Sequence, residues 1–309
     1  MIRRALQSAS ESERLKDTAV TMPVTRGLVD RFVAGEVAEE AVAKAKELTD
    51  RGLTVTIDRL GEAIEDRAGA EGARDDYLVL LDLLQAAGLH ADAEVSVKLS
   101  ALGQALQDEG HAVALDNARA ICAKAQAIGT TVTVDMEDHT TTNATLAAVR
   151  ALREDYPWVG AVLQAYLFRT EQDCRDLAHE GSRVRLCKGA YREPSSVAYT
   201  KRHEIDLSYV RCMKVLLHGD GIPMLATHDP RLIEIGRAVA VHAERPPGTY
   251  ELQMLLGVRP EEQTRLADSG ETVRVYIPYG EDWYGYMVRR LAEKPANMSL
   301  FLKSVRSKK

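Results

Sequence analysis

A stretch near the C-terminal end of the chain places charged and aromatic side chains on one helix face. Residues 274–300, RVYIPYGEDWYGYMVRRLAEKPANMSL, have the pattern of an apolar strand, a break and then a helix. Tyr286, Arg289, Arg290 and Glu293 fall at i, i+3, i+4 and i+7 of that helix. Paired guanidiniums match a carboxylate or phosphate, and a tyrosine ring can cover an apolar body, so this face is a candidate anion site. The alternative is a solvated charge ladder with an Arg289 to Glu293 ion pair.

The composition limits what the rest of the chain can be. With 309 residues, 45% hydrophobic and 28% charged, it can bury one large core, as two ordinary domains or one α/β barrel. The formal net charge of -6 and the lack of a basic stripe speak against a nucleic-acid partner and favour a small molecule. The four cysteines have no metal-ligand spacing and are expected to be reduced core residues.

Strand and helix patterns alternate along most of the chain. The strand patterns are Leu53–Leu60, Glu94–Leu99, Thr131–Glu137, Gly160–Tyr166, Arg183–Gly189, Ile222–Thr227, Tyr250–Leu255 and Val273–Ile277. The helical patterns are Asp30–Asp50, Asp75–Ala87, Ala112–Ile128, Ala144–Glu154, Glu171–His179, Ser195–Leu217, Pro230–Ala243, Pro260–Ala267 and Trp283–Glu293. These are the strand and helix units of a (βα)8 TIM barrel with an extra helix in front.

We therefore expect one domain over residues 1–309, with a helical arm at 1–50, the barrel at 51–300 and a tail at 301–309. The competing architecture is an open doubly wound sheet. That fold would normally show a GxGxxG turn after its first strand, which Leu60, Gly61 and Glu62 do not supply.

Polar residues gather at the predicted strand ends. They are Arg59, Glu62, Lys98, Asp135, Glu137, Asp138, Gln164, Arg185, Lys188, Thr227, His228, Gln253 and Tyr276. The C-terminal strand ends of a barrel meet at one mouth, so a ring of such residues predicts a polar site there.

Two chemistries can be weighed before any family is considered. His139 and His228 belong to different strands and form no HxH or HExxH spacing, which speaks against a metal hydrolase. A Schiff-base aldolase stays open, because Lys98 or Lys188 near a strand end could become a nucleophile if desolvated.

Seven motifs follow one another along the chain: VSVKLSAL, VTVDMED, VLQAYLFR, RLCKGAYRE, ATHD, YELQMLLG and RVYIPYG with YMVRRLAEKPANMS. In this order they resemble the strand-end motifs of the proline dehydrogenase family over Leu53–Ser299. The resemblance implies a distorted (βα)8 barrel with the last helix over its mouth. It also implies a flavoprotein that binds FAD non-covalently, oxidises L-proline to 1-pyrroline-5-carboxylate and passes the electrons to a membrane quinone.

The resemblance also assigns substrate residues. Those for the proline carboxylate are Lys98, Arg289 and Arg290. Those around the pyrrolidine ring are Tyr191, Leu255, Tyr276 and Tyr286. In the family an aromatic residue matching Tyr276 accompanies preference for proline over hydroxyproline. Glu62 would pair with Arg289 as a gate over the bound substrate.

The cofactor residues that the resemblance implies are Met136, Gln164, Arg185, Lys188, Gly189, Ala190, Thr227 and His228. Arg185 would also be catalytic, since a fixed cation near the flavin stabilises negative charge. Asp135 is the second catalytic residue; among cations it should stay ionised, so we expect it to orient charges before it acts as a base. Asp229 stands where Asn is usual and adds a negative charge near the FAD phosphates.

The expected partners are L-proline and a quinone, with no nucleic acid and no metal. The reduced cysteines suggest a cytoplasmic protein. The short basic tail SLFLKSVRSKK could touch the inner face of the membrane, and an oligomer stays open. Two rival functions remain: the Schiff-base aldolase, and a barrel that binds FAD or proline without turnover.

Overall fold

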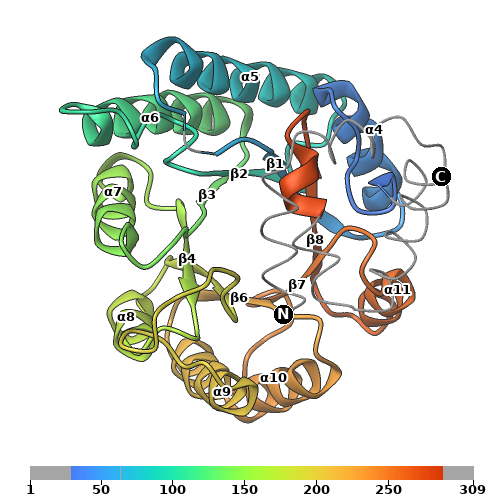
Figure 1. Ribbon diagram of the computed structural model, residues 1–309. Coiled ribbons are helices and arrows are strands. Elements are labelled where there is room, and N and C mark those ends of the chain that lie inside the picture. Colours follow the sequence, from blue (N-terminus) through green and yellow to red (C-terminus); the bar gives the residue numbers. More distant parts are fainter. Residues whose placement is uncertain (1–28, 63, 288–309) are drawn as a thin grey trace, which may run out of the picture.

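Parallel strands close into a barrel at the centre of this computed structural model, which describes residues 29–62 and 64–287 (Figure 1). Within the described chain the strand order is β1 to β8, with β8 paired to β1. The strands are β1 (Thr54–Arg59), β2 (Ala93–Val97), β3 (Val132–Val134), β4 (Gly160–Gln164), β5 (Arg183–Cys187), β6 (Ile222–Ala226), β7 (Glu251–Leu255) and β8 (Val273–Tyr279). The predicted (βα)8 barrel is confirmed, and the open sheet is wrong.

Helices surround the barrel on its outside (Figure 1). They are α4 (Ala38–Thr49), α5 (Arg67–Ala86), α6 (Gly110–Ile128), α7 (Thr142–Asp155), α8 (Thr170–Leu177), α9 (Arg202–His218), α10 (Pro230–His242) and α11 (Pro260–Asp268). Residues 283–287 are helical after β8, and the predicted continuation of that helix lies outside the described residues.

Helix starts differ from the sequence pattern where capping decides them. α5 begins at Arg67, earlier than the predicted Asp75, because the Asp66 side chain accepts a hydrogen bond of 2.7 Å from the Gly69 N–H. α9 begins only at Arg202, so residues 188–201 form a long loop after β5. That loop carries several of the predicted site residues.

The barrel strands are buried on both faces, and successive side chains point to opposite sides. All five residues of β2 are buried. Glu94 contacts two arginines of β5 and therefore points into the barrel. Side chains alternate along a strand, so Val95 and Val97 lie on the opposite, outward face. Inward polar residues and outward apolar residues thus share one strand.

The arm packs against its own barrel where it is described. Ala41, Ala45 and Leu48 of α4 belong to the main hydrophobic core. The segment before α4 runs beside the end of β8, since the Ala34 N–H donates to the Pro278 carbonyl oxygen at 2.9 Å. The predicted division of residues 1–309 into arm, barrel and tail as one domain stays a prediction.

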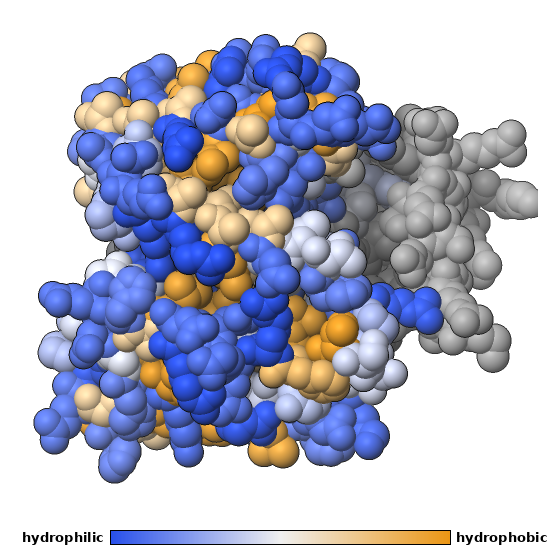
Figure 2. All heavy atoms as spheres, turned by 90° about the vertical axis from the view of Figure 1, so that its left-hand side faces the viewer, coloured by the Kyte–Doolittle hydropathy of each residue, from blue (hydrophilic) through white to orange (hydrophobic). Residues whose placement is uncertain are grey.

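Hydrophilic side chains cover most of the face over α6, α7 and α8, with apolar ones showing between them (Figure 2). No helix in residues 29–62 or 64–287 is long and apolar enough to cross a membrane. Cys122, Cys174 and Cys212 are buried free thiols and Cys187 is a half-buried one, as the sequence indicated.

Candidate active site

Ionic side chains from four strands meet at the C-terminal end of the barrel. The carboxylate of Asp58, at the end of β1, accepts two hydrogen bonds of 2.7 Å from Lys98 Nζ, which follows β2. Asp135, after β3, accepts a bond of 2.7 Å from Arg185 Nη1 of β5. The Tyr276 hydroxyl of β8 donates to the other Asp135 oxygen at 2.6 Å. The structure thus brings together Lys98, Asp135, Arg185 and Tyr276, four of the predicted site residues.

A second ionic layer lies deeper inside the barrel. Glu94 pairs with Arg183 at 2.6 Å and with Arg185 at 3.1 Å. Glu251 pairs with Arg274 at 2.7 Å. Gln253 joins this layer to the mouth, because it accepts from Arg185 at 2.8 Å and donates to Glu251 at 3.0 Å.

Together the two layers form one network, which we call the barrel ion network. Its cations are Lys98, Arg183, Arg185 and Arg274, and its carboxylates are Asp58, Glu94, Asp135 and Glu251. Each cation has a carboxylate partner, as buried charges require.

The network holds most of its members in their charged forms. Burial by itself would raise the pKa of Glu94, but Arg183, Arg274 and Arg185 outweigh burial and hold that pKa well below its ordinary value. Burial would lower the pKa of Lys98, but Asp58 and Asp135 outweigh it and raise that pKa. A lysine nucleophile needs the opposite shift, so this environment speaks against the Schiff-base aldolase.

The predicted flavin residues lie on neighbouring strand ends and in the loop after β5. Lys188 Nζ pairs with Asp206 of α9 at 2.5 Å and with Asp229 at 3.4 Å. The His228 Nε2 accepts a bond of 2.9 Å from the Leu255 N–H. Thr227 is buried beside them. Asp229, the departure from the family pattern, caps the N-terminus of α10 and shares its carboxylate with Lys188.

Gln164 offers a direct test of whether a flavin fits. Its side-chain nitrogen donates a long bond of 3.5 Å to the Met136 carbonyl oxygen. Its side-chain oxygen is buried and has no hydrogen-bond partner in the described part of the chain. A buried acceptor without a donor is costly, and the ring N–H of a flavin is a donor of the right kind. The residues present therefore fit the group.

A buried carboxylate fastens the loop after β5, and we call its contacts the Glu193 clasp. The Glu193 carboxylate contacts His139 Nδ1 and accepts a bond of 2.9 Å from the His139 backbone N–H. It also accepts a bond of 3.0 Å from the Tyr166 hydroxyl. Gly189, with φ of 108°, lies so close to the Tyr166 ring that a Cβ there would fall 2.3 Å from it. The clasp therefore fixes the loop that carries Gly189, Ala190 and Tyr191.

The remaining predicted residues are less tightly grouped. Tyr286 is buried in a small apolar cluster with Leu60 and Trp283, and half-buried Leu255 packs against that cluster. Ala190 and Glu62 are exposed, and Tyr191 is half-buried. Arg289 and Arg290 lie outside the described residues, so neither the carboxylate site on the last helix nor the gate to Glu62 is described.

Sequence reasoning missed Asp58, Glu94 and Glu193. A signal for the first two was present, because Thr56 and Asp58, and Glu94, Ser96 and Lys98, alternate with apolar residues in strands buried on both faces. Polar residues at every second position mark an inward face. Among the described residues, no group of three or more His, Cys, Asp or Glu could hold a metal ion.

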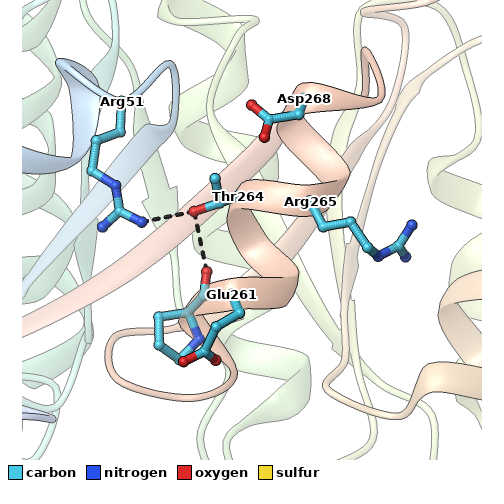
Figure 3. Close-up of a pocket in the computed structure, with 6 residues that line it drawn as sticks. Arg51, Glu261, Thr264, Arg265 and Asp268 are labelled. Atoms are coloured by element: carbon cyan, nitrogen blue, oxygen red, sulfur yellow. Dashed lines mark hydrogen bonds between the residues drawn. The ribbon is translucent and has the colours of Figure 1, made fainter.

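A separate hollow lies on the outside, between α11 and the turn after α4 (Figure 3). Arg51 Nη2 donates to the Thr264 hydroxyl at 2.7 Å across it. None of its lining residues, which are Arg51, Pro260, Glu261, Thr264, Arg265 and Asp268, belongs to the barrel ion network.

Known proteins resemble this chain along its whole length. A family model described as Proline dehydrogenase matches residues 41–303. Proline dehydrogenase 1 of Bacillus subtilis (strain 168) is 35% identical over 309 residues, 100% of both chains. Proline dehydrogenase of Deinococcus radiodurans is 39% identical over 281 residues, 90% of each chain.

A solved structure shares the barrel. Proline utilization A (PutA) from Bdellovibrio bacteriovorus, inactivated by N-propargylglycine, superposes with a TM-score of 0.81 at 26% identity. The match covers 92% of this chain and 34% of that one, so this chain spans about a third of the PutA chain. The family match and the long relatives agree with the barrel and its charged mouth: the chain belongs to the proline dehydrogenase family, a family of flavoenzymes, and is an oxidoreductase of that kind.

Proposed function

We propose that this enzyme oxidises L-proline to 1-pyrroline-5-carboxylate with non-covalently bound FAD. The observation that carries the proposal is the cluster of Lys98, Asp135, Arg185 and Tyr276 at the barrel mouth, in a chain whose long relatives are named proline dehydrogenases. When bound, FAD supplies the acceptor at N5 for a hydride from C5 of proline, and the electrons then pass to a membrane quinone.

The substrate would enter with its carboxylate toward the cations. Lys98, whose Nζ lies 3.7 Å from Asp135, is the described cation proposed for this carboxylate, and Arg289 and Arg290 are its sequence-predicted partners. Paired charge-assisted bonds fix orientation as well as binding. Tyr191, Leu255, Tyr276 and Tyr286 would surround the ring and keep water from it.

The cofactor residues would come from neighbouring strand ends and from the loop after β5. Arg185 would hold a positive charge close to the flavin ring, and Gln164 would accept from the ring N–H. Met136, Lys188, Gly189, Ala190, Thr227 and His228 complete the proposed cofactor set. Gly189 has no side chain, so its backbone can lie against the Tyr166 ring, where a Cβ would clash.

Asp135 is assigned a positioning role. Its two oxygens accept from Arg185 and Tyr276, and Lys98 lies 3.7 Å away. A carboxylate so engaged orients three neighbours and stabilises their positions, and we assign it this role before that of a general base.

The cellular setting is also part of the proposal. We expect a cytoplasmic enzyme that contacts the membrane peripherally, where the quinone lies. The basic tail at residues 301–309 supports that contact by its charge and its apolar residues. An oligomer is compatible with this placement.

Two rivals would be separated by one measurement. We would record the visible spectrum of the purified protein before and after adding L-proline without oxygen, with hydroxyproline as the control substrate. The proposal expects an oxidised-flavin spectrum that bleaches with proline and hardly with hydroxyproline. A flavin spectrum that proline leaves unchanged would favour the non-catalytic barrel. A colourless protein that FAD cannot reconstitute would favour the aldolase, which borohydride trapping of Lys98 would then test.

A further inference from the structure

Asp58 is a buried carboxylate without a role so far. It is the penultimate residue of β1, is 1% exposed, and both of its oxygens lie 2.7 Å from Lys98 Nζ. Two charge-assisted bonds from one ammonium fix its position more firmly than one bond would. Asp58 therefore decides where the Lys98 charge lies.

Asp135 competes with Asp58 for the same ammonium. The Asp135 Oδ2 atom lies 3.7 Å from Lys98 Nζ, a full ångström farther than either oxygen of Asp58. Asp135 is already engaged by Arg185 and by the Tyr276 hydroxyl. Without an ionised Asp58, Lys98 would move onto Asp135 and disturb both of these contacts.

We propose that Asp58 is a positioning residue for the oxidation of proline: it holds the Lys98 ammonium away from Asp135, so that Lys98 presents a fixed charge to the substrate carboxylate. The inference rests on the proposed role of Lys98 in substrate binding. Asp58 acts through Lys98, not through contact with the substrate.

The same geometry makes substrate binding depend on pH. Burial raises the pKa of Asp58 to about 6, against the opposing effect of Lys98. The charged and titratable groups that face it are Lys98 after β2, Asp135 after β3, Tyr276 and Tyr279 of β8, and Tyr77 of α5. Protonation below that pH would remove the ion pair and release Lys98.

The test compares three variants of the full-length, flavin-loaded enzyme: Asp58→Asn, Lys98→Met and the Asp58→Asn/Lys98→Met double variant. The matched control is Asp82→Asn, which removes an exposed Asp–Lys ion pair with Lys124 on the outer helices. We expect Asp58→Asn to raise the KM for proline about tenfold or more with a smaller change in kcat. Adding it to Lys98→Met should raise KM no further, because the two residues act as one unit.

A second readout isolates the charge effect. A five-membered ring carboxylate with an ether oxygen in place of the amine has a carboxyl pKa near that of an α-carboxyl group and keeps one negative charge from about pH 5 to about pH 8, so its inhibition constant reports the protein alone. In the unsubstituted enzyme this constant should rise as pH falls through about 6. In Asp58→Asn it should be weaker throughout and lack that rise. A purely structural role for Asp58 would not move this pH profile.

The outcomes separate the inference from the proposed function. If Lys98→Met leaves the KM unchanged, the substrate role of Lys98 is wrong, and the role of Asp58 is then wrong too. If Lys98→Met raises the KM while Asp58→Asn leaves it unchanged or lowers it, the Asp58 inference alone is wrong. Should Asp58→Asn fail to fold, the charge-balanced double variant replaces it: equal KM values in that variant and Lys98→Met support the inference, and a further rise overturns it.

Discussion

Single residues at the barrel mouth are defined by the partners they share. Tyr276 combines two functions in one side chain, because its hydroxyl donates to Asp135 at 2.6 Å while its ring lies 5.2 Å from the Arg185 guanidinium carbon. A cation over an aromatic face is held by the ring quadrupole. The tyrosine thus links a carboxylate and an arginine on two other strands.

Replacing the hydroxyl separates these functions. We expect Tyr276→Phe to lower kcat/KM for proline about five- to tenfold, because Asp135 loses one donor, worth about 1 kcal/mol. The ring stays, so the preference for proline over hydroxyproline should persist. Steady-state kinetics on both substrates measure this. Equal kcat/KM in the variant and the unsubstituted enzyme would mean that the bond to Asp135 has no catalytic value.

At the scale of elements, the loop of residues 188–201 depends on the Glu193 clasp. This loop carries Lys188, Gly189 and Tyr191 but no regular secondary structure over most of its length. Glu193 ties it to His139 after β3 and to Tyr166 after β4. One carboxylate therefore holds this loop to the segments after β3 and β4.

We expect Glu193→Gln to loosen the loop. The amide keeps some hydrogen bonding but replaces the carboxylate that contacts His139 Nδ1, at a cost of about 1 to 3 kcal/mol. Protease cleavage within residues 188–201 should become faster and flavin retention during gel filtration weaker. Glu204→Gln, which affects a weaker pair with Lys201 at 3.5 Å, is the control. If both variants match the unsubstituted protein, the clasp is dispensable.

Asp229 has two kinds of contact at the start of α10. Its carboxylate caps the helix through the Arg231 N–H and also contacts Lys188 at 3.4 Å. Asn caps helices about as well as Asp, so Asp229→Asn should keep the stability of α10. Lys188 would be less neutralised, and we expect FAD to bind several-fold more tightly, measured by flavin fluorescence titration of the apoprotein. Weaker binding would contradict the assignment of Lys188 to the cofactor set.

At the scale of the whole molecule, the barrel interior is held by ion pairs as well as by apolar packing. Two of its carboxylates, Glu94 and Glu251, have pKa values below those of an ordinary glutamate because neighbouring arginines outweigh burial. Removing one partner of such a pair leaves a buried charge uncompensated. The same ion pairs therefore stabilise the fold and hold Lys98, Asp135 and Arg185 in place.

The shifted pKa values predict that the fold is less stable in acid. A glutamate whose pKa is lower in the folded protein than in the unfolded chain stabilises the fold at pH values above the unfolded pKa near 4.5. That contribution is lost as the pH falls below this value. Asp58 has the opposite sign, since its pKa is raised to about 6, and it offsets part of the loss. We expect the free energy of unfolding, from urea titrations, to fall between about pH 5 and pH 3.

The variant Glu94→Gln tests whether Glu94 causes the loss of stability in acid. At pH 7 it should lose about 3 to 5 kcal/mol of stability, because Arg183 and Arg185 lose their shared carboxylate. Its stability should also depend less on pH in the acid range. Glu47→Gln, which removes an exposed ion pair with Lys44 on α4, is the control. An unchanged acid profile in Glu94→Gln would assign the pH dependence to other groups.

The sequence determined the architecture and much of the site. Alternating strand and helix patterns predicted the barrel, because the apolar period of each element depends on local residues only. Strand-end positions then predicted Lys98, Asp135, Arg185 and Tyr276, since parallel strands in a barrel end at one mouth. The family resemblance supplied their expected roles.

Only the tertiary structure decided which charges pair. Glu94 meets Arg183 and Arg185 across 89 and 91 positions of sequence, and Tyr276 meets Asp135 across 141. Such partners are set by strand register and by the closure of the barrel, which no local pattern encodes. The same holds for Asp58: its spacing marks an inward face, but only the pairing of β1 with β2 brings both of its oxygens onto Lys98, while closure of the barrel brings Tyr276 to Asp135.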